Sequence, residues 1–84
     1  MKRILLVLLA CAGLFSTIAF ALQQFGTESD AAKHCPQDTV VWLNMPTMIW
    51  HYKGQRWYAR TQRGAFACEK EAAASGARGT KNGQ

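Results

Sequence analysis

The stretch at positions 48–60, which reads MIWHYKGQRWYAR, decides the fold. Side chains of a β-strand alternate between its two faces, and in this stretch the alternation separates apolar from polar residues. One face would carry Met48, Trp50, Tyr52, Trp57 and Ala59. The other would carry His51, Lys53, Arg56, Tyr58 and Arg60, with Ile49 as the exception. This division predicts a half-buried antiparallel hairpin that turns at Gly54, with either Tyr52 or Trp50 opposite Trp57.

The sequence on both sides of this hairpin completes the expected fold. Residues 39–43 are β-branched or apolar on both faces, which predicts a central strand. Positions 61–64 read as a loop, after which Phe66 returns to the core. Residues 69–75 predict a short helix with acids in its first turn and Gly76 as its stop. The expected fold class is α+β: a small three-stranded antiparallel sheet with one short C-terminal helix, preceded by an N-terminal signal or transmembrane helix.

The N-terminus has the pattern of an export signal. Lys2 and Arg3 precede an uncharged, mostly apolar run over residues 4–22, and residues 19–21 read Ala-Phe-Ala. Signal peptidase cleaves after such a small-x-small pattern, so residues 1–21 are expected to be a signal peptide. The run is also long enough to span a bilayer, which leaves an uncleaved membrane anchor over 4–22 as the alternative. In either case the rest of the chain is expected outside the cytoplasm, periplasmic or secreted.

The chain of 84 residues has room for one domain. Residues 22–33 are small and polar and are expected to form a flexible lead-in. Residues 34–78 would form the domain, and residues 79–84 a disordered tail. After removal of residues 1–21 the chain keeps eight basic and five acidic residues, for a net charge of +3. This modest excess suits an anionic partner without requiring one.

Two cysteines, Cys35 and Cys68, follow the proposed cleavage site. Exported proteins keep disulfides, and so small a core needs additional stabilisation, so we expect these two residues to pair. The alternative is a zinc site formed by Cys35, Cys68, His34 and His51. Adjacent His34 and Cys35 are awkward to point at one metal, and the chain has no Cys-x-x-Cys or His-x-x-x-His spacing. We therefore expect no metal and no cofactor.

Several motifs resemble a family of small exported bacterial proteins, usually described as hypothetical or signal-peptide proteins. They are His34-Cys35-Pro36, residues 38–42, residues 51–58 around Gly54-Gln55-Arg56-Trp57, and residues 64–69 followed by Gly76-x-Arg78. The resemblance covers residues 34–84 and implies export and a compact domain. A fainter one, to small zinc-binding modules of the Ada type, rests on residues 50–57 and the short helix after them. Those modules carry cysteines where this chain has Gln55 and residues 79–83, so the resemblance concerns architecture and not zinc.

Two non-catalytic functions fit these observations, beside the alternative of a small zinc-binding module built on the four-residue set above. The first is a binding or interaction module of the cell envelope that uses the cationic hairpin face: His51, Lys53, Arg56, Tyr58 and Arg60. Cations beside an aromatic ring can hold anionic groups and stack on a ring. Its partner would be an anionic envelope component or another protein; the sequence does not favour a nucleic acid, and a membrane would be met only through an uncleaved N-terminal segment. The second is a purely structural envelope protein without a ligand.

The sequence does not favour an enzyme. Glu69 and Glu71 lie at the start of the predicted helix, where their charges suit the helix dipole. A disulfide-bonded Cys68 is no nucleophile, and no serine–histidine or cysteine–histidine pattern stands out.

Overall fold

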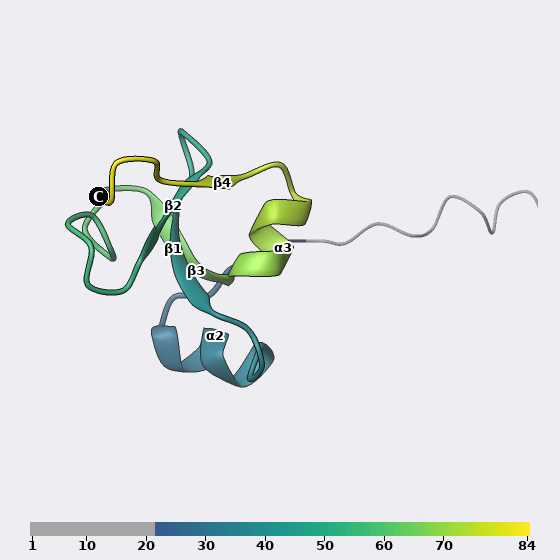
Figure 1. The fold of residues 1–84 in the computed structure, drawn as a ribbon. Helices are drawn as coiled ribbons and strands as arrows, with labels where there is room; N and C mark the ends of the chain where they lie inside the picture. The colour runs from purple at the N-terminus through teal and green to yellow at the C-terminus, as the bar shows by residue number, and fades with distance from the viewer. Residues whose placement is uncertain (1–21) are drawn as a thin grey trace, which may run out of the picture.

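The computed structural model describes residues 22–84 and shows an α+β domain with two short helices and a four-stranded mixed sheet. In chain order the elements are α2 (Glu28–His34), β1 (Val40–Asn44), β2 (Ile49–Tyr52), β3 (Gly64–Cys68), α3 (Glu69–Ala74) and β4 (Arg78–Gly79). The strand order is β3-β1-β2-β4. Figure 1 shows α3 beside the sheet and α2 below it.

The central strand is β1, as the sequence predicts. It pairs antiparallel with β2 in the register Trp42↔His51 and antiparallel with β3 in the register Trp42↔Phe66. The β1–β2 connection is closed by a hydrogen bond from the Met48 N–H to the Asn44 carbonyl, 2.8 Å long. The short strand β4 runs parallel to β2, with Ile49 opposite Arg78.

One face of the sheet carries the apolar core. Val41, Leu43 and Trp50 point to this face, and all three are buried. Ala72 of α3 and Ala77 pack against them, and their small side chains let this part of the chain approach the sheet closely. Gly79 also lies against this core, because a Cβ atom there would come within 3.0 Å of Trp50 Nε1.

The opposite face is aromatic and is covered by the segment that follows β2. Cross-strand neighbours share a face, so Trp42, His51 and Phe66 lie side by side here. The Trp42 and Phe66 rings meet edge to face with centroids 4.9 Å apart, and Tyr58 packs on Phe66 at 5.6 Å. The Trp42 Nε1–H donates a 2.8 Å hydrogen bond to Thr61 Oγ1.

Helix α2 is tied to the free side of β3. Thr27 caps the helix by accepting a hydrogen bond from the Asp30 N–H. Phe25 forms a two-way backbone bridge with Phe66. The predicted disulfide joins Cys35 at the end of α2 to Cys68 at the end of β3. A native bridge in so small a domain stabilises it by about 2–5 kcal/mol.

The predicted hairpin at residues 48–60 is wrong in its second half. Residues 53–59 form consecutive turns, and the third strand is β3 at residues 64–68. Backbone hydrogen bonds in this segment join residues three apart, from Gln55 to Tyr52 and from Tyr58 to Gln55. Ala59 adopts a left-handed conformation, with φ of 58°, which no strand residue has. The sheet therefore has four strands in mixed orientation, not three antiparallel ones.

Both flanking segments are ordered parts of the domain. The expected flexible lead-in, 22–33, contains the bridge at Phe25 and most of α2. The expected disordered tail, 79–84, continues β4 and returns to the domain through hydrogen bonds at Thr80 and Gln84.

The expected signal peptide over 1–21 and most of the alternative anchor expected over 4–22 lie outside the described residues. Within residues 22–84, no helix has the length and apolar character needed to cross a membrane.

Candidate functional site

The structure does not gather the five predicted binding residues into one surface. Lys53 and Tyr58 turn toward Glu28 of α2: Lys53 Nζ lies 2.8 Å from Glu28 Oε2, and the Tyr58 hydroxyl donates to Glu28 Oε1 at 2.8 Å. The hydrogen bond from Lys53, followed by that from Tyr58, lowers the pKa of the Glu28 carboxyl. Burial, followed by the hydrogen bond to Glu28, raises the pKa of Tyr58. These two residues therefore attach α2 to the turn segment.

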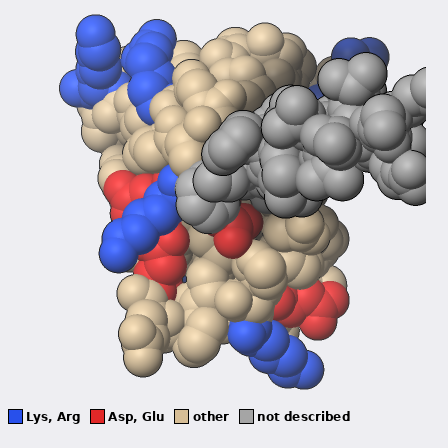
Figure 2. Space-filling model, turned by 90° about the vertical axis from the view of Figure 1, so that its right-hand side faces the viewer, with Lys and Arg blue, Asp and Glu red and all other residues tan. Residues whose placement is uncertain are grey.

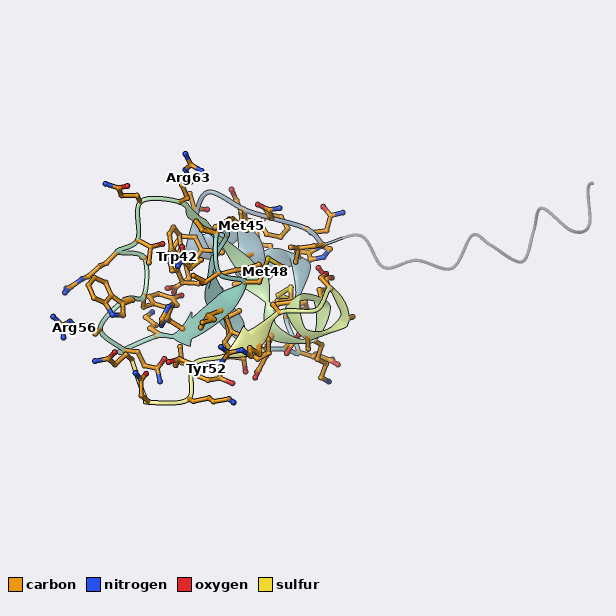
Figure 3. The ribbon with its side chains drawn as sticks, turned by 90° about the horizontal axis from the view of Figure 1, so that it is seen from above. Trp42, Met45, Met48, Tyr52, Arg56 and Arg63 are labelled. Carbon is orange, nitrogen blue, oxygen red and sulfur yellow. A yellow bond between two sulfur atoms is a disulfide. The ribbon has the colours of Figure 1, made fainter. Side chains whose placement is uncertain are left out.

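Arg56 lies apart from this cluster. Its guanidinium carbon lies 5.0 Å from the centroid of the Trp57 ring, and the side chain points away from the domain (Figure 3). Figure 2 shows that on one face the basic side chains of the described residues lie in separate groups, some of them beside acidic side chains, and form no continuous patch.

The remaining two candidates, His51 and Arg60, line the same pocket. Its volume is about 500 Å³, which falls within the usual size range of small-molecule sites. Three parts of the chain form its walls: the facing ends of β1 and β2, residues 57–62, and the last residues of the chain. The lining residues are Asn44, Thr47, Ile49, His51, Trp57, Arg60, Thr61, Gln62, Thr80, Asn82 and Gln84.

Sheet pairing and tail contacts hold these walls in place. Ile49 and His51 share one face of β2, because alternate residues of a strand point the same way. The parallel pairing of β4 brings in the tail, where the Thr80 N–H donates to the Trp50 carbonyl at 3.0 Å. The Trp57 N–H donates to the Gln84 carbonyl at 3.1 Å, which joins the tail to the segment that carries Arg60.

His51 is the unusual member of the lining. The residue is only 7% exposed, and its buried Nδ1 atom has no hydrogen-bond partner among the described residues. Such a group costs free energy unless a partner satisfies it. A residue that is both buried and part of a pocket wall is typical of a binding site.

Two side chains at the rim add complementary chemistry. The Trp57 indole is 39% exposed, and Arg60 is also exposed. An exposed indole offers a flat surface for a sugar ring or another ring, and a guanidinium binds a carboxylate or phosphate through two parallel hydrogen bonds. The amides and hydroxyls of the walls can both donate and accept hydrogen bonds. The pocket is therefore equipped to bind a small, polar, anionic molecule.

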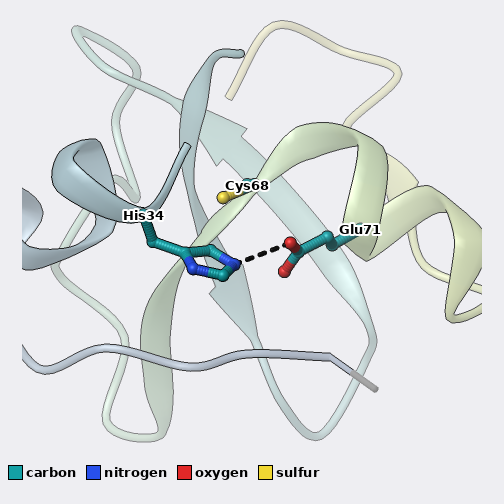
Figure 4. Close-up of side chains that lie close together, drawn as sticks. All are labelled: His34, Cys68 and Glu71. Carbon is teal, nitrogen blue, oxygen red and sulfur yellow. Dashed lines mark hydrogen bonds and ion pairs between the residues drawn. The ribbon is translucent and has the colours of Figure 1, made fainter. Parts of the chain in front are cut away.

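A second cluster lies on another part of the domain. His34 Nε2 and Glu71 Oε2 are 2.7 Å apart, and a ligand atom from each of His34, Cys68 and Glu71 lies within 4.8 Å of the other two (Figure 4). Of the zinc set considered from the sequence, His34, Cys35 and Cys68 meet here, but His51 does not belong to this group. Glu71 stands in its place.

Sequence reasoning missed most of the pocket. Asn44 ends β1, Gln62, Asn82 and Gln84 are ordinary loop and tail residues, and nothing in the spacing of these four residues indicates a shared site. Trp57 was assigned to the buried face, whereas it is the large apolar side chain exposed at the rim. In the sequence, only the triplets Trp50-His51-Tyr52 and Arg56-Trp57-Tyr58 indicated that this part of the chain could carry a site.

No protein-family model, curated protein or solved structure matches this chain, so its function is inferred from the geometry of its own residues.

Proposed function

We propose that this protein is a small non-catalytic binding module of the cell envelope, and that the pocket beside β2 takes the acidic sugar units of an envelope glycan. The observation that carries the proposal is a pocket of about 500 Å³ in which the buried His51 lies in the wall and the exposed Trp57 and Arg60 lie at the rim. The N-terminal segment supplies the route out of the cytoplasm.

Each part of an acidic sugar has a counterpart in the pocket. The apolar face of a sugar ring stacks on the exposed indole of Trp57. The acid group pairs with Arg60. The ring hydroxyls meet the side-chain amide of Gln62 and the remaining hydrogen-bonding capacity of the Asn44 and Asn82 amides.

Of the five residues of the cationic face expected from the sequence, the proposal keeps as ligand residues only those that line the pocket. Arg60 and His51 remain as ligand residues, because both line the pocket. Lys53 and Tyr58 become structural, because Glu28 already uses the Lys53 ammonium and the Tyr58 hydroxyl. A ligand that used the whole face would require Lys53, and a ligand of the pocket would not.

The test is calorimetric titration of the protein with soluble cell-wall fragments that contain N-acetylmuramic acid, whose lactyl group supplies the carboxylate. Neutral oligomers of N-acetylglucosamine are the matched ligand without the acid. Arg60→Gln is expected to weaken binding of the acidic fragment by about ten- to a hundredfold, the range for a hydrogen bond to a charged group. It should leave binding of the neutral oligomer almost unchanged.

Two further variants separate the pocket from the wider face. Trp57→Ala is expected to weaken binding of both ligands, because each stacks a sugar ring on the indole. Lys53→Gln is the matched charge control and should bind like the unaltered protein. Equal binding of the acidic fragment by the unaltered protein and Arg60→Gln would refute the pocket. A loss in Lys53→Gln as large as that in Arg60→Gln would restore the wider cationic face.

A further inference from the structure

The chemistry around the disulfide carries a second inference, independent of the pocket. Three elements end or begin at this point: His34 is the last residue of α2, Cys68 the last of β3, and Glu71 lies in the first turn of α3. Cys35 follows His34 and is bonded to Cys68. The Cys68 sulfur, an imidazole and a carboxylate therefore lie close together (Figure 4), and the disulfide holds the Cys35 sulfur beside that of Cys68.

One atom of this cluster is unsatisfied. Glu71 Oε2 pairs with His34 Nε2, but Glu71 Oε1 is buried and has no hydrogen-bond partner among the described residues. A buried carboxylate oxygen without a donor is costly. A cation bound beside it would satisfy that oxygen.

The histidine is already oriented by its neighbours. The Phe25 ring packs against the His34 ring with centroids 5.2 Å apart, and the backbone bridge from Phe25 to Phe66 fixes Phe25 in turn. Its Nε2 faces Glu71. From the sequence, adjacent His34 and Cys35 are awkward to point at one metal; in the structure the end of α2 brings both close to Cys68.

We propose that reduction of the Cys35–Cys68 disulfide opens a tetrahedral Zn²⁺ site formed by the two cysteine thiolates, His34 Nε2 and a Glu71 carboxylate oxygen. Disulfide sulfurs do not act as thiolate ligands, so the oxidised protein has only two ligands to offer. In the reduced protein all four ligands are types that zinc accepts. Zinc–ligand bonds of about 2.0–2.3 Å place tetrahedral ligand atoms roughly 3.3–3.8 Å apart. One ligand atom from each of His34, Cys68 and Glu71 lies within 4.8 Å of the other two, and Cys35 is bonded to Cys68.

The electron and proton balance requires a reductant. A small-molecule or protein dithiol supplies two electrons and two protons to the disulfide and becomes a disulfide itself. The two cysteine thiols formed then lose their protons to solvent when Zn²⁺ binds. The metal would join the end of α2 to the β3–α3 junction, the same two places that the disulfide joins, so the domain has a cross-link in both redox states.

The test uses the protein as purified from the cells that express it. One sample stays oxidised, and the other is reduced without oxygen and freed of reductant. Each is titrated with Co²⁺, whose absorption reports tetrahedral thiolate ligation, and then with Zn²⁺ as competitor. The reduced protein is expected to bind one equivalent with thiolate charge-transfer and tetrahedral visible bands, which Zn²⁺ removes. The oxidised protein should show none.

Ligand variants distinguish the proposed site from two free thiolates. His34→Gln and Glu71→Gln are each expected to weaken metal binding at least tenfold. Asp30→Asn, a change at an exposed acid of α2, is the matched control and should bind like the unaltered protein. Circular dichroism before and after Zn²⁺ addition shows whether the reduced chain needs the metal to fold, and the proposal predicts native-like structure with zinc bound.

Three results would overturn the proposal. One is the absence of a tetrahedral cobalt spectrum in the reduced protein. Another is metal binding that His34→Gln and Glu71→Gln leave unchanged, which would show that two thiolates of an unfolded chain suffice. The last is a reduced chain that binds zinc and stays unfolded.

Discussion

Trp50 and Trp42 lie on neighbouring strands but on opposite faces of the sheet, and their surroundings differ. Trp50 is buried with Val41 and Leu43, and its Nε1 has no hydrogen-bond partner among the described residues. Trp42 is half-buried, and its Nε1–H binds Thr61 in the segment that covers this face. The first face stabilises the fold by excluding water. The second face is closed by a polar segment, and such a segment can leave space for a ligand.

The contrast also explains where the site lies. On the first face, Ala72 of α3 and Ala77 pack small apolar side chains against the sheet. On the second face, turns and tail residues meet the sheet through hydrogen bonds, and their polar side chains line the pocket. Alternate residues of the same strands thus face the apolar core and the pocket.

The largest expected effect comes from shortening one side chain on each face of the sheet and comparing the losses of stability. Leu43→Ala is expected to lower the free energy of unfolding by about 2–5 kcal/mol, because the side chain is fully buried and the cavity cannot refill. Ile49→Ala, on the pocket face and half-exposed, should cost roughly 1 kcal/mol. Urea denaturation measures both. Equal losses of unfolding free energy would show that the pocket face contributes as much to stability as the apolar core does.

The close contact at Gly64 gives the next largest effect. A Cβ atom at this residue of β3 would come within 2.5 Å of the Trp42 ring. Gly64→Ala is therefore expected to lower stability by about 1–3 kcal/mol, the usual cost of overpacking. Gly26→Ala is the matched control, since nothing lies within 4 Å of its added methyl group. A thermal melt in which both variants behave alike would mean that Trp42 can move aside.

The segment over the second face contains one residue, Ala59, whose backbone strain a substitution can remove. Ala59 has φ of 58°, a conformation that glycine adopts without steric cost. Ala59→Gly is expected to raise the free energy of unfolding by about 0.5–1 kcal/mol. The same exchange within a helix, Ala32→Gly in α2, should lower it by a similar amount. A loss of stability in Ala59→Gly would contradict the turn conformation described for residues 53–59.

The smallest effect is the pH dependence of the contact between α2 and the turn segment. Lys53 and Tyr58 lower the pKa of Glu28 in the folded state from its ordinary 4.5. This contribution to stability is therefore present above about pH 4.5 and is lost as the pH falls through the lower folded-state pKa. Stability measured from pH 7 down to pH 3 should fall less steeply in Glu28→Gln than in the unaltered protein.

Lys53→Gln serves as the matched variant for this measurement. It removes the leading cause of the shift while leaving the hydrogen bond from Tyr58, so its profile should lie between the other two. Identical profiles for all three proteins would show that the cluster does not link α2 to the turn segment in solution.

Sequence reasoning succeeded where a single local rule decides the structure. The β-branched run predicted β1 to within one residue, and the acids and alanines after Cys68 predicted α3. The disulfide followed from the cysteine count. Helix α2 also had a local signal, Thr27 as a cap followed by acids at positions 28 and 30, which the small polar composition concealed.

The errors occurred where distant residues decide the structure. Alternation over residues 56–60 suggested a strand, but the neighbour of β1 is β3, and the 53–59 segment folds into turns instead. Strand β4 has two residues and no periodicity of its own. Its position depends on Gly79 fitting against Trp50. The pocket combines these two missed segments, so it could not be anticipated from spacing along the chain.

The brevity of β4 has a consequence for motion. Its two pairs, Ile49↔Arg78 and Trp50↔Gly79, contrast with the five pairs between β1 and β3. Short edge pairings open locally at a far lower free-energy cost than the global transition. The amides of Arg78 and Thr80 should therefore exchange with heavy water much faster than those of β1. Since Thr80, Asn82 and Gln84 form one wall of the pocket, release of this edge would admit a ligand while the sheet stays intact.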